Sequence, residues 1–261
     1  MKSTRKSHNM SSEKTDQLYS QPRESITDFV FDDAVVAVFD DMIGRSVPGY
    51  RTLLSMFAVL AREFVTPQSV CYDLGCSLGA ATLAIQQGIT ARNVSIIAVD
   101  NAPAMIEKCR LMTQQLRPNG ESGDAQGVRV DVVQADLCET PIDNASLVVM
   151  NFTLQFIDEN MRQQQIEKIF SGLNQGGVFI LSEKICSPDM REQNSLTLLH
   201  HAFKKANGYS ELEISQKRTA LEKVLVPETV EQHITRLRQA GFSQVMVWFQ
   251  CFNFVSFLAI K

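Results

Sequence analysis

The 261-residue sequence has no apolar run approaching the ~18–20 residues that a membrane-spanning helix requires. Its N-terminus carries basic residues without the apolar stretch that follows them in a secretory signal, so we expect a cytoplasmic protein with no membrane partner. An excess of basic residues is missing as well, because 25 Lys and Arg stand against 29 Asp and Glu, for a net charge of −4. Nucleic-acid-binding domains usually carry a basic stripe, and this balance therefore argues against direct binding of nucleic acid.

The sequence also lacks the spacings of disulfide-rich and metal-binding proteins. None of its 6 cysteines forms a C-x-x-C pair, and its 4 histidines show no metal-ligand spacing. We therefore predict reduced thiols, no disulfide framework and no bound metal. Cys76 lies inside a glycine-rich turn and could be a nucleophile, but no histidine is near it in sequence and a small residue suits such a turn. The cysteines are Cys71, Cys76, Cys109, Cys138, Cys186 and Cys251.

A glycine motif stands between two apolar segments that read as strands. The first segment ends at Asp73 and is followed by Gly75 and Gly79, and the second ends at Asp100. Glycines let a backbone approach a ligand where side chains would block it. A carboxylate after the second strand can accept hydrogen bonds from a ribose diol. The spacing is Asp-x-Gly-x-x-x-Gly and departs from the G-x-G-x-x-G of dinucleotide sites, which favours S-adenosyl-L-methionine (SAM) as the ligand.

The rest of the chain alternates between helical and strand patterns, which predicts an α/β fold with a doubly wound, mostly parallel, seven-stranded sheet. We expect a disordered polar tail over residues 1–25 and a single SAM-binding domain over 26–261, with a helical insertion at about 189–225. The expected strands are 69–74, 95–100, 128–133, 146–151, 178–183, 245–252 and 254–260, the last two forming an antiparallel hairpin. The expected helices are 32–43, 50–64, 80–87, 102–115 capped by Asn101, 158–172, 189–224 broken at 207–208, and 227–240, with a loop at 118–127.

Ligands of such sheets bind beyond the carboxyl ends of the strands, where this sequence places polar residues. The backbone of Gly75, Cys76 and Ser77 can approach the methionine portion of SAM. Asp136 can accept from the adenine amino group while the Leu137 amide donates to the ring. Each such residue alone could serve a turn or a cap, but four successive polar strand ends beside a glycine turn predict a bound adenosyl compound. Asn101 follows Asp100 at the second end, and Asn151 closes the fourth strand, where it can hold the α-amino group.

The segment after the fourth strand bears on the reaction. Amine-directed methyltransferases often have Asn/Asp-Pro-Pro-aromatic there, whereas this chain has Asn151-Phe-Thr-Leu-Gln155. His200, His201 and His233 lie on predicted helices, where histidines are mostly packing or surface residues. The late pair Lys217-Arg218 fits a solvated helix face, or a guanidinium that clamps a substrate carboxylate.

Several long segments resemble the bacterial carboxy-S-adenosyl-L-methionine synthases, and the similarity runs from about Asp32 to the C-terminus. The N-terminal tail is longer and more polar than is usual in that family. The segments are Ser46-Val-Pro-Gly-Tyr50, Tyr72-Asp-Leu-Gly-Cys-Ser77, Asn151-Phe-Thr-Leu-Gln-Phe156, Ala206-Asn-Gly-Tyr-Ser-Glu-Leu-Glu-Ile-Ser-Gln-Lys-Arg218 and Trp248-Phe-Gln-Cys-Phe-Asn-Phe254.

The resemblance implies a class I methyltransferase fold that does not methylate. Such enzymes convert SAM and prephenate to carboxy-SAM, phenylpyruvate and water, and a partner enzyme uses the product to build 5-oxyacetyl uridine at the tRNA wobble position. It also implies a homodimer, in which Arg218 is the catalytic residue and binds the new carboxylate. The residues implied to contact SAM are Tyr50, Gly75, Cys76, Ser77, Asp100, Asn101, Asp136, Leu137 and Asn151.

Two other functions stay open on the residues alone. The chain could be a conventional SAM-dependent methyltransferase, or a SAM-binding module without turnover that acts through a partner. A requirement for prephenate would distinguish the synthase from a conventional methyltransferase, and conversion of SAM would distinguish it from a binding module.

Overall fold

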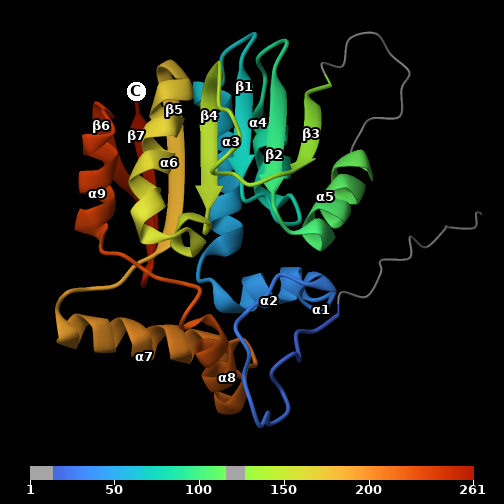
Figure 1. Cartoon of the computed structure of the whole chain (residues 1–261), viewed down its shortest axis with the longest axis vertical. Coiled ribbons are helices and arrows are strands. Elements are labelled where there is room, and N and C mark those ends of the chain that lie inside the picture. Colours follow the sequence, from blue (N-terminus) through green and yellow to red (C-terminus); the bar gives the residue numbers. More distant parts are fainter. Residues whose placement is uncertain (1–13, 116–126) are drawn as a thin grey trace, which may run out of the picture.

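The computed structural model describes residues 14–115 and 127–261, which form a seven-stranded sheet with helices on both faces (Figure 1). The strand order is β3-β2-β1-β4-β5-β7-β6. Strands β3 to β5 of that order run parallel, and β7 is antiparallel to both β5 and β6. The predicted fold class is therefore confirmed. The strands are β1 (Val70–Leu74), β2 (Ser95–Asp100), β3 (Arg129–Gln134), β4 (Ala145–Asn151), β5 (Leu173–Lys184), β6 (Gln244–Cys251) and β7 (Phe254–Ile260).

The sheet separates two hydrophobic cores, as the central strand β4 shows. Leu147 and Val149 belong to one buried cluster, and Val148 and Met150 to the other, because successive side chains of a strand point to opposite faces. Helices α3 (Tyr50–Phe64) and α4 (Ala80–Gly88) cover the first face. Helices α6 (Glu159–Gly172) and α9 (Val230–Gln239) cover the second, and α5 (Pro103–Gln115) packs beside β2 and β3.

The chain changes direction across the sheet at β1, which pairs with β2 on one side and with β4 on the other. In an open α/β sheet this reversal leaves a crevice beyond the carboxyl ends of the two strands. Four helices gather at that edge in Figure 1: α1 (Asp33–Val36), α2 (Phe39–Ser46), α7 (Met190–Ala206) and α8 (Glu211–Leu221). Helices α7 and α8 lie within the segment predicted as a helical insertion and are separated by Gly208, whose φ is 89°.

The single helix predicted over 32–43 is two helices, which corrects that expectation. The Asp32 carboxylate accepts from Val35 N and caps α1, and the chain then turns at Val38, whose φ is −129°. The turn lets Val35, Val38 and Met42 pack into one buried cluster with Leu78. The helical periodicity of this segment gives no sign of such a turn. Strand β5 is also longer than predicted, beginning at residue 173 instead of 178.

The prediction of a disordered tail over residues 1–25 is wrong for its second half. Asp16 and Tyr19 are buried, 2% and 8% exposed. Gln216 on α8 donates from Nε2 to the carbonyl oxygens of Tyr19 and Gln21, both at 2.9 Å. The polar composition of this segment concealed these contacts because they are made with residues about 195 positions away in sequence. Residues 1–13 and residues 118–126 of the loop predicted at 118–127 lie outside the described residues.

A buried carboxylate holds the segment that follows β4. Glu183 in β5 is 0% exposed, and its two oxygens accept from the amides of Leu154 and Gln155, each at 2.9 Å. Leu154 begins the short 3₁₀ helix η1 (Leu154–Phe156). Burial raises the pKa of Glu183 from 4.5 to about 8, although these hydrogen bonds act in the opposite direction.

The tight contact of α3 with α4 gives a first prediction. A Cβ on Gly88 would lie 2.0 Å from the Ala58 carbonyl oxygen, whereas a Cβ on Gly44 of α2 would meet nothing within 4 Å. Gly88→Ala should lower the free energy of unfolding by roughly 1–3 kcal/mol through overpacking. Gly44→Ala, the matched control, should be neutral or stabilising by about 0.5–1 kcal/mol. Urea unfolding of both variants checks this, and equal midpoints would contradict the packing assignment.

The buried carboxylate gives a second prediction. Because the pKa of Glu183 is higher in the folded state, the unfolded chain binds fewer protons between pH 4.5 and about 8. The contribution of Glu183 to stability therefore falls as pH rises through this window. Glu183→Gln carries no charge, so its stability relative to the unsubstituted protein should rise steadily from pH 5 to pH 8. Urea titrations at several pH values measure it, with the exposed Glu231→Gln as control; parallel curves for Glu183→Gln would contradict the assignment.

Candidate active site at the carboxyl ends of the strands

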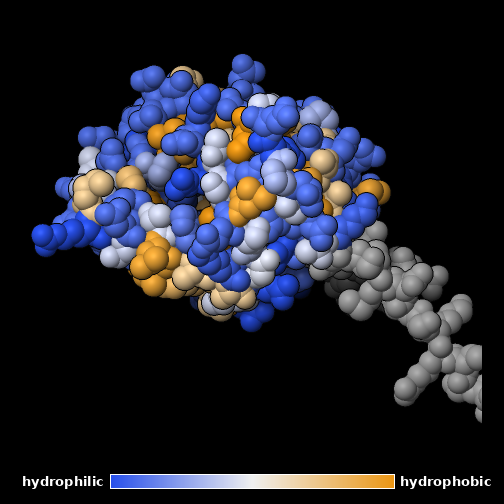
Figure 2. Space-filling view, turned by 90° about the horizontal axis from the view of Figure 1, so that it is seen from below, coloured by the Kyte–Doolittle hydropathy of each residue, from blue (hydrophilic) through white to orange (hydrophobic). Residues whose placement is uncertain are grey.

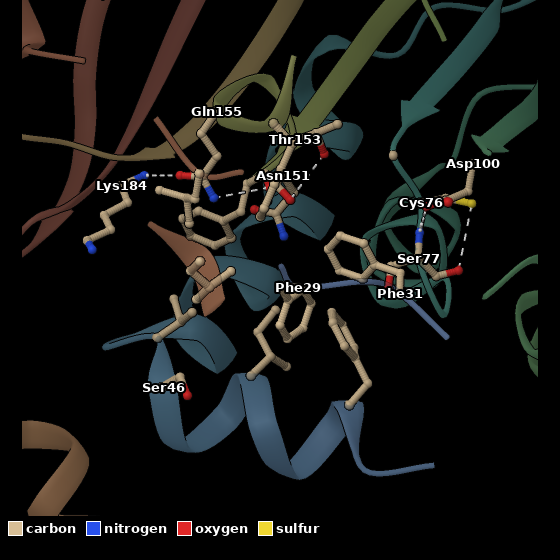
Figure 3. A pocket seen from close by; sticks show the side chains of 18 of the residues that line it. Phe29, Phe31, Ser46, Cys76, Ser77, Asp100, Asn151, Thr153, Gln155 and Lys184 are labelled. Atoms are coloured by element: carbon tan, nitrogen blue, oxygen red, sulfur yellow. Dashed lines mark hydrogen bonds between the residues drawn. The ribbon is translucent and has the colours of Figure 1, made fainter. Parts of the chain in front are cut away.

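A cavity of about 530 Å³ lies between the carboxyl ends of the strands and the helices gathered there (Figure 3). Its volume is in the usual range for small-molecule sites. The floor comes from the ends of β1, β2, β4 and β5, and the roof from α2, α7, α8 and the aromatic rings of Phe29 and Phe31. The two rings stack edge to face with centroids 5.1 Å apart, and Phe31 contacts Phe156 of η1 in the same way at 5.5 Å.

Every residue predicted to contact SAM lines this cavity. Arg218 does not line it and is exposed on α8. The residues that the fold brings together are Tyr50, Gly75, Cys76, Ser77, Asp100, Asn101, Asp136, Leu137 and Asn151.

The glycine turn is compact because its amides bond to neighbouring strand ends. Gly75 N and Cys76 N both donate to the Val99 carbonyl, at 2.8 and 2.9 Å, and Ser77 N donates to Asp100 Oδ2 at 2.9 Å. Gly75 has a φ of 83°, and a Cβ there would lie 2.3 Å from Thr153 Oγ1. Only glycine fits this position. Because these amide hydrogens are already bonded within the protein, the turn offers a ligand hydrogen-bond acceptors and a backbone that it can approach closely.

Asp100 sits at the centre of the predicted ribose site. Its Oδ1 accepts at 2.9 Å from the amide of Ala102, the residue before α5. Burial raises the pKa of Asp100, with the amide hydrogen bonds opposing the shift. Each carboxylate oxygen can accept more than one hydrogen bond, which leaves room for a diol. Asp136 is arranged alike, because its Oδ1 accepts from Cys138 N at 2.7 Å.

Asn151 and Phe152 form a strained corner at the end of β4. Phe152 has a φ of 61°, unusual for a residue with a side chain, and Ser77 across the cavity has 49°. The side-chain oxygen of Asn151 is buried and has no hydrogen-bond partner among the described residues. A buried acceptor without a donor is costly. An ammonium group of a ligand would satisfy it, and the α-amino group of SAM is such a donor.

The structure also reveals a group of basic side chains that sequence reasoning missed. Lys184 at the end of β5, His200 and Lys204 on α7, and Lys217 on α8 all line the cavity. The solvated face expected for Lys217-Arg218 holds for Arg218 and is wrong for Lys217, which is 6% exposed. The i, i+4 spacing of His200 and Lys204, which places both on one helix face, is the signal that could have found them.

His200 combines packing with cavity lining. Its ring meets Phe254 edge to face at 5.0 Å, and its Nε2 lies 2.8 Å from the Ser46 carbonyl oxygen. A carbonyl only accepts, so Nε2 carries the proton. Burial, followed by the nearby Lys204 charge, lowers the pKa of His200 to about 3. The imidazole is therefore neutral at physiological pH and acts as a fixed donor to the end of α2.

Neither a metal centre nor a membrane segment is found in residues 14–115 and 127–261. No group of three or more His, Cys, Asp or Glu side chains there could hold a metal ion. No helix in the same residues is long and apolar enough to cross a bilayer.

Comparison with solved structures identifies the fold. The chain is similar to an O-methyltransferase from Nostoc punctiforme (TM-score 0.58, 16% identity, covering 88% of this chain and 59% of that one). It is similar to human N-acetylserotonin methyltransferase in complex with SAM (TM-score 0.56, 16% identity, 88% and 55%). A SAM-dependent methyltransferase from Methanococcus maripaludis matches over 92% of this chain and 97% of its own (TM-score 0.55, 18% identity). These likenesses show a class I methyltransferase fold.

Comparison with known sequences identifies the family. A family model described as "Methyltransferase domain" matches residues 71–177. The carboxy-S-adenosyl-L-methionine synthases of Trichlorobacter lovleyi and Geobacter sp. strain M21 are 54% and 52% identical to this chain, each covering 95% of it and 99% of the relative. That of Photorhabdus laumondii is 51% identical, covering 94% of both. The chain therefore belongs to the carboxy-S-adenosyl-L-methionine synthases, enzymes with the class I methyltransferase fold for which SAM is a substrate.

Proposed function

We propose that this chain converts SAM and prephenate to carboxy-SAM, phenylpyruvate and water, and that it works in the cytoplasm as a homodimer. Its product would serve the enzyme that completes 5-oxyacetyl uridine at the tRNA wobble position. The observation that carries the proposal is the cavity, which has an adenosyl-binding edge on one side and basic side chains on the other. Six free thiols suit the reducing compartment.

The roles of the edge residues follow from their positions. Asp100 would accept hydrogen bonds from the ribose hydroxyls, and Asp136 with the Leu137 amide would meet the adenine. Asn151 Oδ1, a buried acceptor without a donor among the described residues, would accept a hydrogen bond from the α-ammonium group. Tyr50 lies over the corner of β4, with its ring 6.4 Å from that of Phe152. Burial raises the pKa of Tyr50 well above its usual value, so the phenol stays neutral beside a sulfonium.

The reaction can proceed without a protein base. Prephenate loses carbon dioxide as its ring becomes aromatic, and the ring hydroxyl departs as hydroxide. Hydroxide removes a proton from the methyl group next to the positive sulfur, giving water and an ylide. The ylide carbon forms a bond to carbon dioxide, giving the carboxymethyl sulfonium. Atoms and charge balance, and the protein contributes positioning and exclusion of water.

A third prediction tests the reaction itself. The purified chain, incubated with SAM and prephenate, should yield a carboxylated sulfonium that mass spectrometry detects as SAM plus the mass of carbon dioxide. SAM alone should give none. Methylation of an added acceptor without any prephenate requirement would make the chain a conventional methyltransferase. Binding of SAM with no conversion under either condition would make it a binding module.

Exposed apolar side chains on the outer face of α7 and α8 support the proposal of a homodimer. Met190 and Leu198 are each 70% exposed there, and Leu199 and Leu212 are 43% and 38% exposed. Figure 2 views the molecule from the side on which these helices lie and shows apolar patches on that face. A second copy of the chain would remove this apolar surface from water. Arg218 is exposed on the same helix α8 and outside the cavity of its own chain. We propose that it reaches the cavity of the second copy and binds the new carboxylate there.

A fourth prediction concerns Arg218. Arg218→Ala should sharply reduce carboxylation and leave SAM affinity largely unchanged, because the guanidinium meets only the transferred group. The exposed Arg92→Ala, at the opposite edge of the sheet, is the matched control and should be fully active. Product formation and SAM titration measure the two effects, and unchanged turnover would remove Arg218 from the site.

Mixed dimers show whether Arg218 acts in the cavity of its own chain or in that of the second copy. Asp100→Ala should abolish SAM binding in its own chain, so neither this variant nor Arg218→Ala should be active alone. A dimer containing one of each would have one complete site if Arg218 acts across the interface. Activity restored on mixing supports that arrangement, and a mixture no more active than its separate components places Arg218 in its own cavity.

A further inference from the structure

Two lysines in the cavity have no partner of opposite charge within the part of the chain that the structure describes. Lys204 on α7 is 8% exposed, and Lys184 at the end of β5 is half-buried. Neither ammonium group has a hydrogen bond or ion pair with any residue in 14–115 or 127–261. Their basic neighbour Lys217 is compensated, since its Nζ lies 3.2 Å from Ser46 Oγ and 3.7 Å from Asp16 Oδ2.

The electrostatics of the two lysines show an excess of positive charge. Burial, together with the smaller effects of the charges of Lys217 and Lys184, lowers the pKa of Lys204 to about 7. Burial likewise lowers the pKa of Lys184. An uncompensated buried charge is unfavourable, and a ligand anion removes much of that cost. Such a site therefore selects for an anion.

The pair lies at the opposite end of the cavity from the adenosyl edge. In Figure 3 Lys184 and Asp100 lie on opposite sides of Asn151. Lys204 is on the Lys184 side, since the charges of Lys184 and Lys217 both act on it. A SAM molecule with its ribose at Asp100 and its α-ammonium at Asn151 would leave the lysine end to the second substrate. That substrate must then be an anion.

We propose that Lys184 and Lys204 bind the 2-oxo-carboxylate of the carboxyl donor, the carboxylate that remains in the phenylpyruvate product; this assignment rests on the proposed function. The other carboxylate leaves as carbon dioxide and loses its charge on the way. A cation held against it would stabilise the ground state more than the transition state and slow the reaction. The 2-oxo-carboxylate keeps its charge throughout and can be bound without that penalty.

The assignment fixes which kinetic constant the lysines control. Binding a group that does not change between ground state and transition state lowers KM without altering kcat. Phenylpyruvate carries the same 2-oxo-carboxylate, and it should compete with the donor at the same lysines.

The experiment compares Lys184→Met and Lys204→Met with Lys205→Met as the matched control. Lys205 is the next residue of α7, but its side chain is 50% exposed and paired with Glu211. Each cavity variant should raise the KM for prephenate by roughly 10- to 100-fold, as expected for loss of one charge-assisted hydrogen bond. The inhibition constant of phenylpyruvate should rise in parallel, and kcat and SAM affinity should stay near their starting values. Lys204→Arg should recover part of the affinity.

The outcomes separate this inference from the proposed function. If the unsubstituted protein forms no carboxylated product with prephenate, the proposed function fails. If it does, and the KM of both variants is unchanged, the lysine site is overturned and the function stands. A fall in kcat with unchanged KM also overturns it, because the lysines would then act on the departing carboxylate. Unchanged SAM affinity in each variant shows that the fold is intact.

Discussion

The constraint on which the structure depends is the double pairing of β1, with β2 on one side and β4 on the other. Parallel pairing aligns the carboxyl ends of these strands at one edge, and the reversal of direction at β1 opens a crevice there. The glycine turn after β1, Asp100 at the end of β2 and Asn151 at the end of β4 meet for that reason alone. Their local geometry supports one another, since Asp100 accepts from Ser77 N, and the turn at Gly75 closes against Thr153.

The crevice is covered by helices that a polar network between segments remote in sequence holds together. The Asp16 carboxylate accepts from the Tyr209 hydroxyl at 2.5 Å and lies beside Lys217, while the Arg45 guanidinium stacks 4.0 Å above the Tyr209 ring. Arg45 also bonds Asp41 and the Asp16 carbonyl. This network joins the N-terminal segment to α2, α7 and α8. A buried polar network stabilises the fold only when each of its members has a hydrogen-bond partner. The N-terminal segment supplies such partners and is therefore held against α8.

The two ends of the cavity differ in charge, and that difference fits a reaction in which SAM is modified and does not simply donate its methyl group. Carboxylates and an amide oxygen line the end proposed for the adenosyl and α-ammonium groups, and lysines line the end proposed for an anion. The low dielectric of a partly buried cavity strengthens the electrostatic attraction at both ends. In the proposed reaction, the rings of Phe29 and Phe31 in the roof of the cavity would keep water from the ylide, which water would protonate.

The amino-acid sequence by itself determined the strand and helix order, the glycine turn and the polar strand ends, because these depend on local periodicity and on residue types with few conformational alternatives. Strand β2 over Ser95–Asp100 and helix α3 over Tyr50–Phe64 begin and end where their patterns predict. The tertiary structure alone decided what lies against what. It buried Lys217 and exposed Arg218, adjacent residues on one helix, and it ordered residues 14–25 through α8. It also left Lys184 and Lys204 lining the cavity without a counter-charge among residues 14–115 and 127–261. Burial and pairing of charge depend on contacts between residues far apart in the chain, and periodicity carries no information about them.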